Sequence, residues 1–548
     1  MLKRHHTPLQ AIYPIGRSLR GSDVADPASV GFKAYNLMRM SAIGLPVPHG
    51  FVLGTAHCRA FLKHKLPELR DLLASQVRSL EAGTGLVFGG ERKPLLLSVR
   101  SGAPVSMPGM LDTVLDVGLN STTLRGFLRM TGNPRLVWDS WRRLIQSFAE
   151  VVHGVGGGVA GGVAGADFDR LLAAALADAF AEPRLATSRD LDFHQMKNLA
   201  TAYLDLYARL VGAPFPQDPL DQLEAATRAV FRSWNSDKAV AYRRINGLAD
   251  DLGTAVTVQR MVFGNAGGTS GSGVGFSRDP ASGENTLYLD FLANAQGEDI
   301  VSGRRALSAS DDLASLLPPV YREIVQVAQR LEHEFRDTQE FEFTVQDGTL
   351  HLLQTRTGKR TPLAALRMAV EQVKEGLIEP AAALARLARL DLDAIESPRL
   401  VLDADTPLLA TANSASLGVA SGRIALDVDA ARRMAENGEP VILVRMEIAT
   451  DDIAGIDVAA GLLTAFGGRT SHAAVVARER NKVCLVGCAS LGIDLAKRKI
   501  TLGEHTLAEG DTICLDGESG QIYAGSPRIE HERPLALLAE VERWKAAT

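Results

Sequence analysis

A helical segment rich in alanine and leucine, residues 360–398, most strongly limits how this chain can fold. It separates a long region of mixed strands and helices from a shorter region, 399–527, in which short strands, glycine turns and helices alternate. The chain has 548 residues, and typical domain sizes suggest about three or four domains for that length. We therefore expect separate folded bodies joined by a helical linker.

Composition and charge exclude several classes of protein. Apolar residues make up 46% and charged residues 22% of the chain, the balance of a globular protein. A net charge of −5 argues against a dedicated nucleic-acid binder. The N-terminal residues lack the apolar centre of a secretory signal, and no apolar run is long enough to span a bilayer. The four cysteines lack the spacing of a zinc site. These features favour a cytoplasmic enzyme or binding protein without nucleic-acid or membrane partners.

Apolar periodicity predicts the main elements of the first region. A helix is expected over 32–44, a buried strand over 94–100, and a helix over 133–152 with an aromatic face. Residues 339–354 predict a β-hairpin, because two apolar-rich strands flank an Asp-Gly pair.

Two glycine-rich segments, 101–110 and 264–275, are expected to form loops. Glycine lets backbone N–H groups come close to phosphates, although neither segment is a Walker sequence. A third segment, 154–166, is of low complexity and predicts a flexible loop.

Two carboxylates alternate along the first strand of the expected hairpin. Glu340 and Glu342 would therefore point to one face, and Gln354 would come within about one residue of facing Glu342. Carboxylates in this arrangement can hold Mg²⁺ against nucleotide phosphates. They can equally form the solvated edge of a sheet.

The segment GGRTSHAAVVAR, residues 467–478, places one histidine at the expected start of a helix. Thr470 or Ser471 would cap that helix, and His472 would lie in its first turn. The helix dipole disfavours imidazolium there, and free N–H groups can bind phosphoryl oxygens. A neutral imidazole beside an anion site suits a phosphoryl-accepting histidine. A histidine at this position could also simply pack or cap.

GGRTSHAAVVAR resembles the phosphohistidine motif of phosphoenolpyruvate-utilising enzymes. The first region is similar to the pyruvate, phosphate dikinase branch of that family in SVRSGAPVSMPGMLDTVLDVGLN, NPRLVWDSWRRLIQ, AVFRSWNSDKAVAYRR, GTAVTVQRMVFGN, NAQGED and LLQTRTGKRT. These motifs are long, and the resemblance covers nearly the whole chain. It implies a multidomain fold of the α/β and α+β classes, with an ATP-grasp-like nucleotide-binding half and a swivelling phosphohistidine α/β domain.

The resemblance and the patterns together divide the chain into four parts. The ATP-grasp-like domain would cover 1–358, with a helical insert at about 121–220. A helical linker at 359–398, the phosphohistidine domain at 399–527 and a C-terminal helix at 528–548 would follow.

The resemblance also implies site residues. Nucleotide-binding roles fall on Lys33, Arg100, Glu298, Glu342, Gln354 and Arg356. Glu340 and Glu342 would hold Mg²⁺, although the family has aspartate where Glu340 stands. The family also has glycine where Phe32 and Ala34 stand, so we expect the loop around Lys33 to adopt a different backbone. A guanidinium such as that of Arg100 gives fixed, bidentate contacts to phosphate.

The implied reaction uses ATP and inorganic phosphate. His472 would attack the β-phosphate of ATP and release AMP, and the γ-phosphate would leave as pyrophosphate. Family members end in a barrel that binds pyruvate, and such a barrel needs about 250 residues, whereas 23 residues follow Gly525. We therefore expect a separate barrel protein as the partner that presents pyruvate. Transfer to another acceptor, and a non-catalytic adenylate-sensing role, stay open as alternatives.

Overall fold

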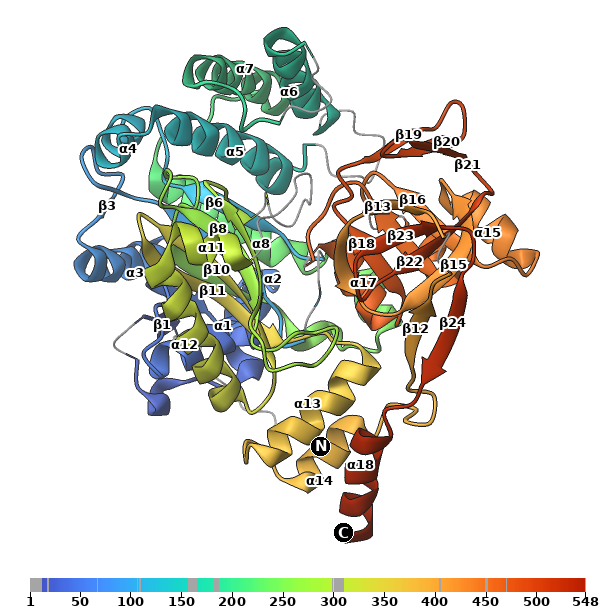
Figure 1. Cartoon of the computed structure of the whole chain (residues 1–548). Helices are drawn as coiled ribbons and strands as arrows, with labels where there is room; N and C mark the ends of the chain where they lie inside the picture. Colours follow the sequence, from blue (N-terminus) through green and yellow to red (C-terminus); the bar gives the residue numbers. More distant parts are fainter. Residues whose placement is uncertain are drawn as a thin grey trace. The chain divides into compact units, whose positions relative to one another are not determined.

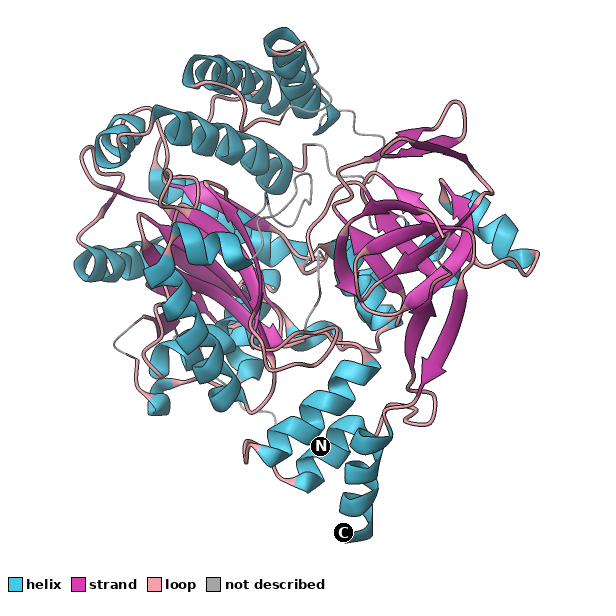
Figure 2. Ribbon diagram, in the orientation of Figure 1, coloured by secondary structure: helices cyan, strands magenta, loops and turns pink. Residues whose placement is uncertain are grey.

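The computed structural model describes residues 12–16, 19–66, 68–105, 107, 110–155, 165–181, 187–297, 299, 310–403, 406–448, 452–469 and 471–547. Two compact units divide the chain. The first unit is Met1–Val262 with His351–Gln354, and the second unit is Phe263–Leu350 with Thr355–Thr548. The four parts expected from the sequence were divided by sequence pattern and expected role, whereas these two units are divided by compactness. The boundaries of the four parts stay a prediction. The fold is mixed, with helices and several sheets in both units (Figures 1 and 2).

The first unit is built on a five-stranded antiparallel sheet. Its strands, in spatial order, are β1 (Ile12–Ile15), β2 (Gly50–Leu53), β7 (Ala255–Arg260), β5 (Leu97–Gly102) and β6 (Thr113–Val117). The strand expected over 94–100 therefore forms as the short β4 (Pro94–Leu95) followed by β5.

Several helices of the first unit pack on this sheet. Those in contact with its strands include α1 (Pro27–Ala42), α2 (Thr55–Leu62), α5 (Pro134–His153) and α8 (Pro219–Ser233). The others described in this unit are α3 (Leu69–Thr84), α4 (Thr123–Thr131), α6 (Gly165–Ala179), α7 (Phe193–Val211) and α9 (Asp237–Ile245). The predicted helix over 133–152 is confirmed as α5, which buries Trp141, Leu144, Ile145 and Phe148.

The second unit contains a four-stranded sheet in the order β11-β10-β8-β9. Its strands are β8 (Gly271–Phe276), β9 (Tyr288–Ala293), β10 (Gln339–Gln346) and β11 (Thr349–Thr357), and the neighbouring helices are α11 (Ser310–Leu316) and α12 (Pro318–Phe335). The predicted hairpin is confirmed. Asp347 and Gly348 have φ of 49° and 75°, as a two-residue turn of type I′ requires.

The glycine-rich segment 264–275 is only partly a loop, and the prediction is wrong for residues 271–275. These residues belong to the buried strand β8. A Cβ atom on Gly273 would lie 2.2 Å from Cζ of Phe343, and one on Gly271 would lie 2.1 Å from Cζ of Phe291. The glycines therefore make room for aromatic rings of the neighbouring strands rather than for phosphates.

A helical cluster follows the four-stranded sheet. It consists of α13 (Pro362–Lys374), α14 (Pro380–Leu387) and, from the end of the chain, α18 (Leu535–Ala547), which share one apolar core (Figure 1). Strand β12 (Ser397–Val401) pairs antiparallel with β24 (Arg528–Glu532). The segment 528–548, expected to be a single helix, thus begins with a strand.

The part of the sequence between β12 and β24 forms an eight-stranded mixed sheet, whose spatial order is β13-β23-β22-β15-β16-β17-β18-β14. Its strands are β13 (Leu408–Thr411), β14 (Asn413–Ser416), β15 (Val419–Ala425), β16 (Val441–Arg445), β17 (Gly461–Thr464), β18 (Val483–Val486), β22 (Thr512–Asp516) and β23 (Gln521–Ala524). Strands β15 to β18 run parallel in this order.

Each face of this sheet has its own apolar core. One core includes residues of α15 (Val428–Glu436), α16 (Ile453–Val458) and α17 (His472–Glu479). The other includes residues of the small sheet formed by β19 (Leu491–Asp494), β20 (Lys499–Leu502) and β21 (His505–Ala508). Neighbouring residues such as Leu462 and Leu463 of β17 belong to different cores, as the alternation of side chains along a strand requires.

None of the helices in the described part of the chain combines the length and the apolar character needed to cross a membrane.

Candidate functional site

Helix α17 begins at His472, as the sequence predicts. Gly467 has a φ of 113°, and the N–H of Ser471 donates to the carbonyl of Gly468 at 3.0 Å, which forms the turn before the helix. The Ser471 hydroxyl accepts from the N–H of Ala474 at 3.5 Å, so Ser471 is the N-cap. The alternative cap, Thr470, lies outside the described residues.

Two arginines anchor the segment that precedes His472. The guanidinium carbon of Arg469 lies 4.2 Å from the centre of the Tyr288 ring, and its Nε lies 3.7 Å from Oδ1 of Asp290. Arg478, which is fully buried, donates from Nη1 to the carbonyl oxygen of Arg469 at 2.8 Å and lies over the Phe276 ring. Both arginines therefore tie the start of α17 to strands β8 and β9.

Strand register places these contacts on the sheet face that carries the two predicted metal ligands. Glu340 is paired with Phe276, which is paired with Tyr288. Residues paired directly across a sheet point to the same face, so Arg469 stacks on the face of Glu340. The same reasoning puts Glu342 and Asp290 on this face, since each is paired with Val274. Burial of the Tyr288 hydroxyl raises its pKa above the usual range.

Glu340 and Arg356 form an ion pair within this face. Glu340 is only 5% exposed, and its Oε1 accepts from Nη2 of Arg356. Burial alone would lower the pKa of Arg356, but the hydrogen bond and charge of Glu340 raise it. Thr355 lies beside Glu340, because its hydroxyl donates to the Glu340 carbonyl at 3.1 Å.

The other carboxylate oxygen of Glu340 fits a metal ligand. Oε2 is buried, and no described residue makes a hydrogen bond to it. A buried carboxylate oxygen normally has a partner, and oxygen ligands of this kind are those that Mg²⁺ takes. The partly exposed Glu342 on the same face could supply a second oxygen.

In the first unit, Lys33 lies beside the end of strand β5, two residues beyond Arg100. Gly31 has a φ of 76°, and a Cβ there would lie 2.2 Å from the carbonyl oxygen of Gly102. The N–H of Phe32 donates to the carbonyl of Ala103 at 3.1 Å. These close contacts hold the kink of α1 at Gly31 against the end of β5, two residues beyond Arg100.

The helix expected over 32–44 is confirmed as part of α1, so residues 32–34 lie in a helix and not in the loop that the resemblance implied around Lys33. Phe32 is 49% exposed, whereas Ala34 is fully buried, so only Ala34 contributes to the core. The backbone adjusts at Gly31, one residue before Phe32.

Arg100 and Gln354 both belong to the first unit, and Nη1 of Arg100 lies 3.5 Å from the Leu353 carbonyl. Gln354 is partly exposed on β11, and its predicted position relative to Glu342 stays a prediction. Glu298 lies outside the described residues. The structure therefore places Lys33 beside β5, the strand that contains Arg100. It also brings Glu340 and Arg356 together in an ion pair.

Sequence patterns missed Arg469 and Arg478, because a single arginine before or within a helix carries no functional signal.

Comparison with protein families identifies two regions. Residues 67–313 match the family model of the pyruvate phosphate dikinase AMP/ATP-binding domain. Residues 437–520 match that of the mobile domain of phosphoenolpyruvate-utilising enzymes. The second region contains β17 and α17, and hence His472.

Curated relatives extend the similarity along most of the chain. The chain is 42% identical over 523 residues to pyruvate, phosphate dikinase of Clostridium symbiosum, with 94% of this chain and 58% of the relative covered. It is 40% identical over 537 residues to the Rhizobium meliloti (strain 1021) enzyme of the same name, with 95% of this chain and 58% of the relative covered. It is 39% identical over 549 residues to the chloroplastic pyruvate, phosphate dikinase 1 of Zea mays, with 98% of this chain and 56% of the relative covered. The chain thus spans a little over half the length of these relatives.

Proposed function

We propose that this chain is an ATP-dependent phosphotransferase whose acceptor is His472. The observation that carries the proposal is the packing of the start of α17, through Arg469 and Arg478, on the sheet face that holds Glu340 and Glu342. A helix start can bind an anion, and the segment just before this helix packs on a sheet face that carries carboxylates suited to a metal. Phosphoryl transfer uses both features.

The proposed phosphorylation of His472 takes two steps. A ring nitrogen of His472 attacks the β-phosphorus of ATP, and the bond to the AMP oxygen breaks. Inorganic phosphate then takes the γ-phosphoryl group, leaving pyrophosphate and phospho-His472. Bound Mg²⁺ would supply positive charge to the phosphate oxygens, held by Glu340 and Glu342.

The chain's own cations have distinct roles in this proposal. Lys33 and Arg100 bind triphosphate oxygens in the first unit, and Arg356 holds Glu340 in place while its exposed side faces the nucleotide. Gln354 and Glu298 complete the nucleotide contacts. Guanidinium groups suit this work because they bind phosphate in a fixed, bidentate geometry.

The similarity to pyruvate, phosphate dikinases supports pyruvate as the final acceptor, presented by a separate barrel. The phosphoryl group would pass from His472 to pyruvate only after α17 leaves the four-stranded sheet. If the barrel is a separate protein, the rate of this second step should rise with barrel concentration.

Isotope exchange tests the proposal. The purified chain with Mg²⁺ should exchange label among ATP, AMP, phosphate and pyrophosphate, and should not convert pyruvate until a barrel protein is added. Binding of ATP with no exchange would contradict the proposal and favour an adenylate-sensing role. Conversion of pyruvate by the chain alone would contradict the need for a separate barrel.

A further inference from the structure

A basic cavity of about 420 Å³ lies where the four-stranded sheet continues into the helical cluster. Its walls come from the residues after β11, from one side of α13, and from the end of α14. Four cationic side chains line it: Lys359, Arg360, Arg386 and Arg389. No carboxylate is among the described residues that line it.

The arginines of this cavity have too few negative partners. Arg360 and Arg386 share one carboxylate: Nη1 of each lies near Oδ1 of Asp337, at 2.7 and 3.4 Å. Arg389 makes no hydrogen bond or ion pair with any residue in the described part of the chain. Three guanidinium groups against one carboxylate leave two positive charges without a balancing group.

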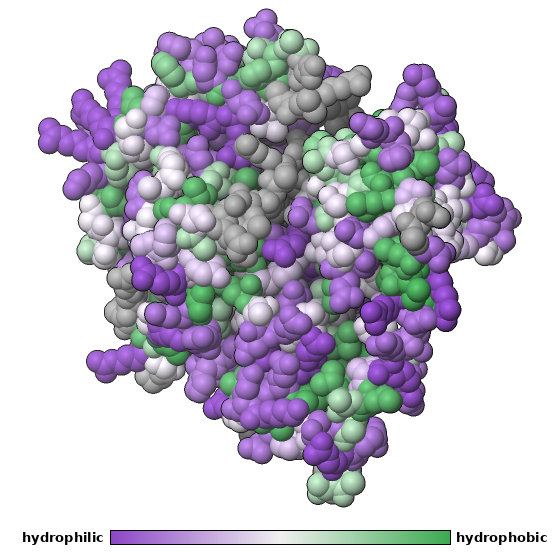
Figure 3. Space-filling view, viewed as in Figure 1, coloured by the Kyte–Doolittle hydropathy of each residue, from purple (hydrophilic) through white to green (hydrophobic). Residues whose placement is uncertain are grey.

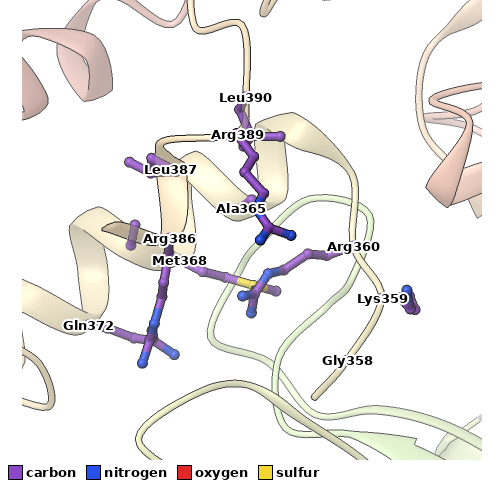
Figure 4. Close-up of a pocket in the computed structure, with 11 residues that line it drawn as sticks. Gly358, Lys359, Arg360, Ala365, Met368, Gln372, Arg386, Leu387, Arg389 and Leu390 are labelled. Carbon is purple, nitrogen blue, oxygen red and sulfur yellow. The ribbon is translucent and has the colours of Figure 1, made fainter. Parts of the chain in front are cut away.

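Neutral contacts fix two of these side chains in place. Arg386 also donates to Oε1 of the buried Gln372 at 3.0 Å, and Arg360 contacts the sulfur of Met368 at 3.7 Å. In Figure 4, the guanidinium groups of Arg360 and Arg389 point into the same space beside Met368. Holding like charges together costs free energy, which a bound anion would offset.

Lys359 takes a different direction. Figure 4 shows it apart from the three arginines, and its ammonium lies 2.7 Å from Oε1 of Glu479, at the end of α17. The recognition elements of the cavity are therefore Arg360, Arg386 and Arg389. The surface over α13 and α14 is mostly hydrophilic on the face shown in Figure 3.

We propose that this cavity binds a small oxyanion with at least two negative charges. Guanidinium groups pair with phosphate and carboxylate oxygens in the same bidentate geometry, so both kinds of oxyanion share the required chemistry. The volume lies within the usual range of small-molecule sites. None of the proposed nucleotide or metal ligands lines the cavity, so the site is additional to the one that handles ATP.

Two probes separate the possible anions. Pyrophosphate and citrate are titrated separately into the full chain by calorimetry, with a saturating non-hydrolysable ATP analogue present to fill the nucleotide site. We expect at least one of them to bind with an affinity that falls as salt is added, since exposed charges are screened. The probe that binds more tightly identifies the anion class. Binding of neither would overturn the proposal.

Arg389→Gln is the decisive variant, because this exposed side chain has no described partner whose loss could disturb folding. It should weaken anion binding about tenfold or more, the usual effect of losing a charged hydrogen bond. Arg432→Gln, at an exposed arginine of α15, is the matched control and should bind like the wild type. Equal weakening in both variants would contradict a site at the cavity.

Asp337→Asn gives a test in the opposite direction. Asp337 competes with the anion for Arg360 and Arg386, so removing its charge should tighten binding. Anion binding that is unchanged in Arg389→Gln, or weakened in Asp337→Asn, would overturn the proposal. Neither result depends on transfer of phosphate to His472, so the outcome is separate from that of the proposed function.

Discussion

The guanidinium of Arg469 stacks on the ring of Tyr288 at 4.2 Å, which ties the residue three positions before His472 to strand β9. A partly desolvated cation–π contact contributes about 1–2 kcal/mol. If this contact docks α17 for phosphorylation, Arg469→Ala should slow labelling of His472 by ATP about tenfold. The affinity for a non-hydrolysable ATP analogue should not change.

Arg480→Ala is the control for that variant. Arg480 caps the other end of α17, and its side chain contacts Asp457 rather than the four-stranded sheet. Rapid-quench labelling of the three proteins compares the rates directly. A normal rate in Arg469→Ala would show that the stacking on Tyr288 does not position His472.

The ion pair between Glu340 and Arg356 leads to a prediction about stability. Arg356→Gln leaves the buried Glu340 carboxylate without its partner and should lower the free energy of unfolding by about 1–3 kcal/mol. Adding Glu340→Gln removes the buried charge, so the double variant should regain part of that stability. Urea unfolding of the wild type and three variants completes the cycle. A double variant less stable than Arg356→Gln would contradict this account.

Strand β8 supplies a test of packing. Gly273→Ala would place a methyl group 2.2 Å from Cζ of Phe343, a clash that should cost about 1–3 kcal/mol of stability. Adding Phe343→Leu should relieve part of the cost. A Cβ on Gly268 would have no atom within 4 Å, so Gly268→Ala should leave the melting temperature unchanged. Equal melting temperatures for the two alanine variants would refute the packing role of Gly273.

The sequence shows clearly those features whose cause is local. The Asp347–Gly348 turn and the capped start of α17 depend on neighbouring residues, and both formed as predicted. The packing role of the β8 glycines could not be predicted from neighbouring residues in the sequence. Glycine alternation looks the same in a loop as beside aromatic rings, and Phe343 lies 70 residues after Gly273 in the chain. The contact of Arg469 with Tyr288 likewise joins distant parts of the sequence.

Burial of His57 predicts a pH dependence of stability. Its side chain is fully buried, and burial lowers its pKa below the usual 6.5. Below about pH 6.5 the unfolded chain therefore takes up a proton at His57 more readily than the folded chain does, and stability falls as the pH falls. Between pH 7.5 and 5.5 this loss can reach about 1.4 kcal/mol.

His57→Phe removes the titrating group and keeps an aromatic ring. Urea unfolding midpoints of the wild type and the variant at both pH values separate His57 from all other titrating residues. We expect the variant to lose less stability on acidification than the wild type. Equal losses would show that the folded state protonates His57 as readily as the unfolded chain does.

The most direct test of the central claim is the identity of the labelled residue after incubation with ATP. ATP labelled in the β-phosphate, with Mg²⁺ and inorganic phosphate, should leave an acid-labile, base-stable label on the peptide that contains His472. ATP labelled in the γ-phosphate should leave none, because that phosphorus departs in pyrophosphate. His472→Ala should abolish the label while the ATP analogue still binds. A label that survives this substitution, or that comes from the γ-phosphate, would contradict the account.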